Sequence, residues 1–170
     1  MKPIEKFETD LVGRVDKIRI GPKKCLMPLF ETIVNSLQAI EDIKTTQTDY
    51  KGEIKVYLIR EKEDDSQLSI DLGKENRQIH SFRIIDNGIG FNNKNYGDFK
   101  KSDTTSKKEK GGKGIGRFSW LKAFEKVRIY SKYIDDEGNT QVKKFLFSLP
   151  DGIYPFDSED QKDLDKYPHG

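Results

Sequence analysis

The chain has 170 residues, of which 35% are charged, and its 31 basic and 29 acidic side chains leave a formal net charge of +2. This near balance excludes a protein whose overall charge would direct it to nucleic acid or to a membrane surface. Cys25 is the single cysteine, which excludes an intrachain disulfide. No segment approaches the roughly 18 apolar residues of a membrane span. We therefore expect a cytoplasmic protein with no membrane partner.

The length suits one domain, with a core of useful size. Leu, Ile, Val and Phe supply about 26% of the residues, above the roughly 20% below which a chain is expected to stay disordered. Residues 1–22 carry scattered apolar positions and end at Gly21-Pro22, which predicts an N-terminal strap that is strand in part.

From Lys24 onward the apolar residues recur at steps of three and four, a spacing that predicts an amphipathic helix of about five turns. The Pro at position 28 fits the first turn of such a helix. The apolar positions of this helix are Leu26, Leu29, Phe30, Ile33, Val34, Leu37 and Ile40.

Three strand-like segments follow, and the polar connections between them suggest antiparallel neighbours. They lie at 54–58, 68–72 and 82–86. The polar stretch 92–113 predicts a long loop with one helical turn, and a loop of that length is usually functional or disordered. A second helix is expected from Ile115 to Phe124.

Two more strands are expected around a turn at 135–139, and residues 150–170 are expected to form an irregular acidic tail that leads to a further C-terminal region. The order of helix, strands, loop, helix and strands lacks the helix after every strand that a parallel sheet requires. It favours an α+β fold in which helices pack on one face of a mixed, mostly antiparallel sheet.

Glu31 and Asn35 are four residues apart, so their side chains share one face of the predicted helix. An amide oxygen is a suitable ligand for magnesium, which takes few ligands from protein and the rest from phosphates and water. A glutamate at the same edge can act as a general base toward a water molecule. The alternative for such a pair is a solvated polar face.

Asp86 ends the third predicted strand and is followed by Asn-Gly-Ile-Gly. A carboxylate there can accept a hydrogen bond from an exocyclic amine such as that of adenine, while Gly88 and Gly90 let backbone approach a ring. The alternative is an ordinary hairpin turn at Asp-Asn-Gly.

A glycine-rich segment runs into the second predicted helix, so several backbone N–H groups point to one place that suits an anion. It departs from the Walker and dinucleotide patterns, because Arg117 follows the last glycine. A flexible hinge is the alternative, and the lysines that precede the segment suit a lid over a polyanion. The candidate phosphate-binding residues are Gly111, Gly112, Lys113, Gly114, Ile115 and Gly116.

Taken together, the three motifs resemble those of the GHKL ATPases, the family of DNA gyrase, heat-shock protein ninety chaperones, histidine kinases and MutL. The resemblance extends from Lys23 to Ser148 and implies a Bergerat-type two-layer α/β sandwich over residues 23–149. It implies ATP and Mg²⁺ as ligands and residues 92–113 as the ATP lid. Gln38 departs from the family, in which many members have Asp at that position.

Matching the motifs residue by residue implies that Asn35 binds magnesium and that Glu31 activates water. It implies that Asp86 binds adenine, that Gly90 backs the base, and that Gly112, Gly114 and neighbouring amides hold phosphates. Since efficient members often borrow a lysine from a following domain, hydrolysis by this segment alone is expected to be weak.

We expect an ATP-dependent homodimeric clamp in the full-length protein, with nucleic acid or a client protein bound through the further region. Two alternatives stay open at this point. One is a nucleotide sensor or scaffold without catalysis, and the other is a kinase-type domain that passes a phosphoryl group to a histidine.

Overall fold

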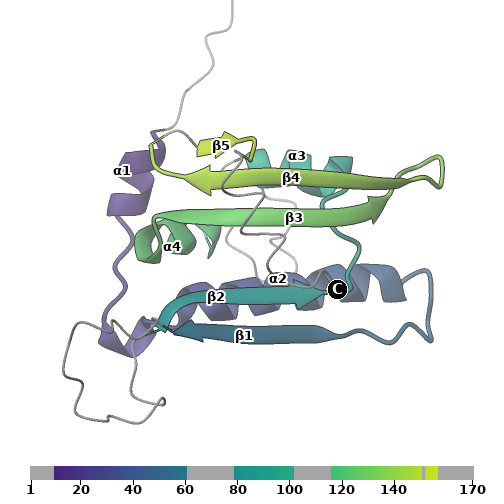
Figure 1. Ribbon diagram of the computed structural model, residues 1–170, viewed down its shortest axis with the longest axis horizontal. Coiled ribbons are helices and arrows are strands. Elements are labelled where there is room, and N and C mark those ends of the chain that lie inside the picture. Colours follow the sequence, from purple (N-terminus) through teal and green to yellow (C-terminus); the bar gives the residue numbers. More distant parts are fainter. Residues whose placement is uncertain (1–9, 61–78, 102–115, 151, 157–170) are drawn as a thin grey trace, which may run out of the picture.

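The computed structural model describes residues 10–60, 79–101, 116–150 and 152–156. Helices and strands both contribute, which confirms the α+β prediction (Figure 1). The helices are α1 (Leu11–Asp16), α2 (Met27–Lys44), α3 (Asn93–Lys100) and α4 (Gly116–Ala123), with a 3₁₀ turn at Pro22–Lys24. The strands are β1 (Ile54–Arg60), β2 (Ile79–Asp86), β3 (Lys126–Ile134), β4 (Thr140–Ser148) and β5 (Gly152–Tyr154).

The described strands form two antiparallel sheets rather than the single mixed sheet predicted from the sequence. β1 pairs with β2, with Ile54 opposite Asp86, and β3, β4 and β5 form the second sheet in that order. β2 and β3 lie in the same layer and point the same way (Figure 1). Within the described chain no backbone ladder joins these two strands, so no parallel pair is formed.

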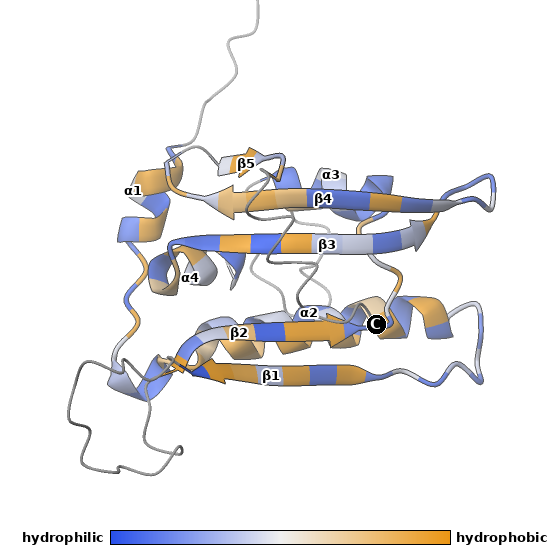
Figure 2. Cartoon of the chain, in the orientation of Figure 1, coloured by the Kyte–Doolittle hydropathy of each residue, from blue (hydrophilic) through white to orange (hydrophobic). Residues whose placement is uncertain are grey.

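The helices pack against one side of this layer. α2 contacts both strands of the first sheet and also α4, while α4 contacts β3 and α1. Phe82 of β2 meets Phe124, just after α4, edge to face with ring centroids 5.7 Å apart. The apolar end of β4 (Figure 2) lies over the core. The buried residues of this core are Val15, Phe118, Trp120, Leu121 and Phe147.

The strand expected in the N-terminal strap is a helix in the described part. The Asp10 carboxylate accepts hydrogen bonds from the backbone N–H groups of Val12 and Gly13, each 3.0 Å long, and so caps α1. Val15 is 1% exposed and belongs to the core. Leu11 and Ile18 pack against the same core, a helical spacing that favours this conformation over a strand.

Residues 93–100 form two turns of helix, where the sequence predicted a loop with a single turn. The Asn92 side chain accepts a hydrogen bond of 2.8 Å from the Asn95 N–H and caps α3. Phe99 then packs against Phe145 and Phe147 of β4, with ring centroids 5.5 and 5.3 Å away. Tertiary contact of a few aromatic rings thus stabilises a polar helix whose own propensity is weak.

The tail expected to be irregular contributes a strand in its first residues. Gly152 has a φ of +80°, which turns the chain back so that Ile153 of β5 lies opposite Phe147 of β4. Ile153 packs against the core, which explains why β5 pairs with β4 although the surrounding sequence is polar. The second predicted strand, at 68–72, lies outside the described residues, as do 102–113 of the predicted lid and 157–170 of the tail.

The turn between β3 and β4 is where the sequence predicted it. The Asp135 carboxylate accepts hydrogen bonds from the Gln141 side chain and from the backbone N–H of Asn139, each 2.8 Å long. These bonds, the Gln141 contact foremost, hold the pKa of Asp135 below its usual value. The predicted helices α2 and α4 and the strands β1 to β4 are likewise confirmed.

None of the helices in the described part of the chain has the length and apolarity required to cross a lipid bilayer.

Candidate functional site

The helix α2 carries the first motif and is joined directly to the second. Ser36, which follows Asn35, is 4% exposed and donates a 2.7 Å hydrogen bond to Asp86 Oδ2. This hydrogen bond is partly buried and its acceptor is charged, so it fixes the carboxylate at the end of β2. Two motifs fifty residues apart in sequence therefore meet.

The turn after β2 is held against the same helix. Asp86 Oδ1 accepts a 2.9 Å hydrogen bond from the Gly88 N–H, and the Ile89 N–H donates to the Ala39 carbonyl over 3.0 Å. A Cβ at Gly88 would lie 2.5 Å from the Ala39 side chain. Only glycine allows the turn to approach α2 this closely.

Gly90 connects this turn to the second sheet. Its φ is +73°, and a Cβ there would lie 2.6 Å from the Lys132 carbonyl oxygen and 2.7 Å from Ser131 Oγ. The next residue, Phe91, donates its N–H to Ser131 Oγ over 2.8 Å. The second motif is therefore fixed between α2 on one side and β3 on the other.

Replacing Gly90 with alanine is expected to lower the free energy of unfolding by about 1–3 kcal/mol, since the left-handed backbone and the contact with Lys132 both penalise a Cβ. Urea unfolding monitored by circular dichroism measures the change. Gly97→Ala is the control, because Gly97 lies within α3 and a Cβ there would enter open space. That substitution should stabilise the protein by about 0.5–1 kcal/mol. Equal effects of the two substitutions would contradict the prediction.

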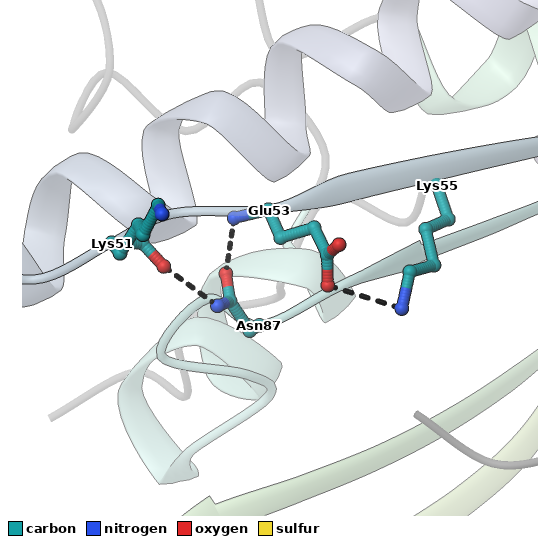
Figure 3. A network of polar contacts seen from close by, with 4 residues as sticks. All are labelled: Lys51, Glu53, Lys55 and Asn87. Atoms are coloured by element: carbon teal, nitrogen blue, oxygen red, sulfur yellow. Dashed lines mark hydrogen bonds and ion pairs between the residues drawn. The ribbon is translucent and has the colours of Figure 1, made fainter.

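Asn87 anchors the turn to the segment before β1 (Figure 3). Its amide nitrogen donates to the Lys51 carbonyl over 3.0 Å, and its amide oxygen accepts from the Glu53 N–H over 2.7 Å. Glu53 also forms an ion pair of 3.1 Å with Lys55. The turn leads from β2 into α3 rather than into a paired strand, so the alternative of an ordinary hairpin turn is wrong.

Glu31 reaches the start of α4, where the third motif ends. A Cβ at Gly116 would overlap the Glu31 carboxylate, so glycine at this position makes room for the acid. The Ser119 hydroxyl, fully buried, donates to the Gly116 carbonyl over 2.6 Å and secures this first turn. The other five predicted phosphate-binding residues lie outside the described chain: Gly111, Gly112, Lys113, Gly114 and Ile115.

Glu31 and Asn35 are both on α2, and Asn35 is followed directly by the buried Ser36. Within the described part of the chain no hydrogen bond or ion pair joins either side chain to another residue. The described residues contain no group of three or more His, Cys, Asp or Glu placed to hold a metal ion. A magnesium ion bound by one amide oxygen, phosphates and water needs no such group.

Two open hollows on the described surface lie at residues 46–51 and 19–24, and neither contains a predicted site residue. The predicted residues that the structure does bring together are Glu31 with Gly116 and Asp86 with Gly88, around α2. Asn35 adjoins this group through its neighbour Ser36.

Sequence reasoning missed the residues that hold the site in place. These are Ser36, Asn87 and Ser131, each of which supplies a side-chain hydrogen bond to another segment. One signal was present for Ser36, a small polar residue at the apolar spacing of an amphipathic helix, three residues after Ile33 and four before Ile40. No such signal pointed to Ser131, because its hydrogen bond with Phe91 depends on how β3 packs against the turn.

Comparison of the chain with protein-family models, with curated proteins and with solved structures found no match.

Proposed function

We propose that this chain is a magnesium-dependent ATP-binding and ATP-hydrolysing domain of the GHKL type, with a Bergerat fold. One observation carries the proposal: the Ser36–Asp86 hydrogen bond of 2.7 Å, which places the acid at the end of β2 beside the residue that follows Asn35. In this arrangement one helix supplies a base and an amide, and the adjoining strand supplies a carboxylate.

Asp86 is suited to recognise the amino group of a purine. One of its oxygens accepts from Ser36 and the other from Gly88, and each retains a lone pair for a further donor. Because both oxygens are held by other groups, the carboxylate is oriented before a ligand arrives. Gly88 and Gly90 lie so close to their neighbours that neither position has room for a side chain.

Asn35 is the residue that would hold magnesium, and the ion when bound would neutralise charge on the phosphates. Glu31 accepts the proton of the attacking water, since its carboxylate lies at the start of α4 beside Gly116. The backbone N–H groups at that helix start suit an anion beside it. Glu31 at this position favours hydrolysis over nucleotide sensing alone.

ATP binding would close the lid of residues 92–113 and bring two copies of the full-length protein together as a clamp, and hydrolysis would reopen it. Size-exclusion chromatography with and without a non-hydrolysable ATP analogue reports the association.

The sensor and histidine-kinase alternatives differ in products: the first releases no phosphate, and the second yields a phosphohistidine on a partner.

Calorimetric titration with a non-hydrolysable ATP analogue, in magnesium or in EDTA, tests the site. The unaltered chain should bind in the micromolar range with magnesium and at least about 10-fold more weakly in EDTA, a difference of about 1.4 kcal/mol. Asn35→Ala should bind equally in both conditions, whereas the control Gln47→Ala, an exposed residue after α2, should behave like the unaltered chain. Undetectable binding in both conditions would refute the proposed function.

A further inference from the structure

Lys143 lies on the side of β4 that faces the core. Its side chain is in phase with Phe145 and Phe147, which are 3% and 4% exposed and pack against Phe99 of α3. Alternation along a strand predicts an apolar residue at such a position, yet the residue is a half-buried lysine. A cation on this side of a sheet requires specific partners to offset its partial loss of hydration.

Two tyrosine rings and two oxygen atoms surround this ammonium. Its Nζ lies 4.6 Å from the centre of the Tyr96 ring and 4.8 Å from that of Tyr133, distances at which a cation is attracted to a ring. It donates a hydrogen bond of 3.1 Å to the Phe91 carbonyl oxygen and a longer one of 3.4 Å to Asn93 Oδ1. Because the N-terminal end of a helix disfavours a cation, these four partners hold the ammonium at the start of α3, and the helix itself does not.

Lys143 is opposite Ser131 in the ladder of β3 and β4, and the two side chains contact the same residue. The Ser131 hydroxyl accepts a hydrogen bond from the Phe91 N–H over 2.8 Å, while Lys143 donates to the Phe91 carbonyl oxygen. One cross-strand pair therefore binds both backbone polar groups of Phe91. Phe91 can move away from the second sheet only if both of these hydrogen bonds break.

Gly90 directly precedes Phe91 and is held by the same contacts. A Cβ on Gly90 would lie 2.7 Å from Ser131 Oγ, so the glycine rests directly on the Ser131–Lys143 pair. Its carbonyl oxygen accepts a 3.0 Å hydrogen bond from the Asn95 side chain, in the first turn of α3. Loss of the Lys143 contact should therefore release Gly90 and the start of α3 together.

We propose that Lys143 is a positioning residue of the nucleotide site, which holds Gly90 at the place where the purine ring rests. The inference rests on the proposed function, in which Gly90 backs the base and Asp86 accepts from its amino group. Lys143 acts through Phe91 and needs no contact with the ligand. When the binding-competent conformation is populated for only a fraction of the time, the apparent affinity is reduced by that fraction.

Calorimetric titration of Lys143→Met with the non-hydrolysable ATP analogue in magnesium tests the proposal. Methionine is unbranched like lysine, but it donates no hydrogen bond and carries no charge. The affinity should fall about 10-fold, as expected if Gly90 holds its position about one-tenth of the time. Lys143→Arg keeps a cation that can donate to Phe91 and stack on the rings, so its affinity should stay within about 3-fold of that of the unaltered chain.

Titration with magnesium tripolyphosphate separates positioning of the purine from a general loss of structure. This ligand has the phosphates of ATP but no base, so Lys143→Met should bind it as the unaltered chain does. The matched control is Lys144→Met, at the adjacent position on the opposite face of β4. The Lys144 ammonium also lies near a tyrosine ring, 5.5 Å from the centre of Tyr130. The control should bind both ligands as the unaltered chain does.

Amide hydrogen exchange of the ligand-free chain, measured by NMR, tests the role of Lys143 without a nucleotide. The Phe91 N–H, which is bonded to Ser131, should exchange at least about 10-fold faster in Lys143→Met. The Ile89 N–H donates to the Ala39 carbonyl on the other side of the turn and should keep its rate of exchange.

Equal affinity of Lys143→Met and the unaltered chain for the ATP analogue would overturn the proposal, as would unchanged exchange at Phe91. Equal losses of affinity for the analogue and for tripolyphosphate would also overturn it, because the effect would then not be specific to the purine. Failure of the unaltered chain to bind the analogue is a different result. It would refute the proposed function and this inference with it, even where exchange shows that Lys143 holds the turn.

Discussion

Glu31→Gln is expected to lower the rate of ATP hydrolysis by about 100- to 10,000-fold, the contribution of a general base. Glutamine keeps the size of the side chain and its place against Gly116, but it cannot take the proton of the attacking water. Affinity for the ATP analogue should therefore stay within about 2-fold of that of the unaltered chain, because the base contributes to the transition state and not to binding. Phosphate release measured over hours, with saturating ATP and magnesium, gives the rate.

Glu41→Gln is the matched control for this substitution. Glu41 belongs to the same helix, is exposed, and lies outside the group of residues around Gly116. Its replacement should leave both rate and affinity unchanged. Retention of full activity by Glu31→Gln would remove Glu31 from the role of base, and a loss of analogue binding in that variant would show that Glu31 holds the nucleotide instead.

Asp86→Asn is expected to weaken binding of the ATP analogue by about 100-fold, since a hydrogen bond to a charged group contributes about 1.5–3 kcal/mol. The amide also turns a donor toward either Ser36 or Gly88, each of which donates to the carboxylate in the native site. Calorimetric titration with ATP and GTP analogues measures the effect. The preference for adenine should be reduced along with the affinity.

Ser36→Ala should reproduce part of this loss, because it frees Asp86 without removing its charge. Ser148→Ala is the matched control: both serines are at most 5% exposed, and Ser148 is bonded to Tyr154 away from the site. Each substitution should cost about 1 kcal/mol of stability, yet only Ser36→Ala should weaken nucleotide binding. An Asp86→Asn variant with native affinity would separate Asp86 from purine recognition.

Local patterns were sufficient to predict the elements that carry the motifs. The three- and four-residue apolar spacing of α2 and the alternation in β1 predicted the type of each element correctly. The burial they imply is only partly found, because Phe30, Val34 and Leu37 of α2 are 47–58% exposed. The motif from Asp86 to Gly90 also predicts a turn from its sequence alone, since glycine permits the positive φ that Gly90 adopts. The α+β class followed from the order of these elements.

Other elements formed against their local signals. α3 is polar apart from a few rings, and it is stabilised by Phe99 against Phe145 and Phe147. β5 lies at the start of an acidic stretch and pairs with β4 because Ile153 reaches the core. The apolar residues of α1 have no clear spacing in the sequence, and the helix is stabilised by the contact of Val15 with α4. In each case contacts distant in sequence outweigh a weak local preference.

By itself, the sequence determined which residue types stand on which elements: Glu31 and Asn35 on one helix, Asp86 at the end of a strand, and Gly116 at the start of another helix. Only the tertiary structure decided that Ser36 holds Asp86, that Gly90 rests on Ser131 and that Glu31 meets Gly116. The periodicity of a sequence fixes the face of its own helix or strand on which a side chain lies. Which side chains of different elements meet depends on how the surfaces of those elements pack.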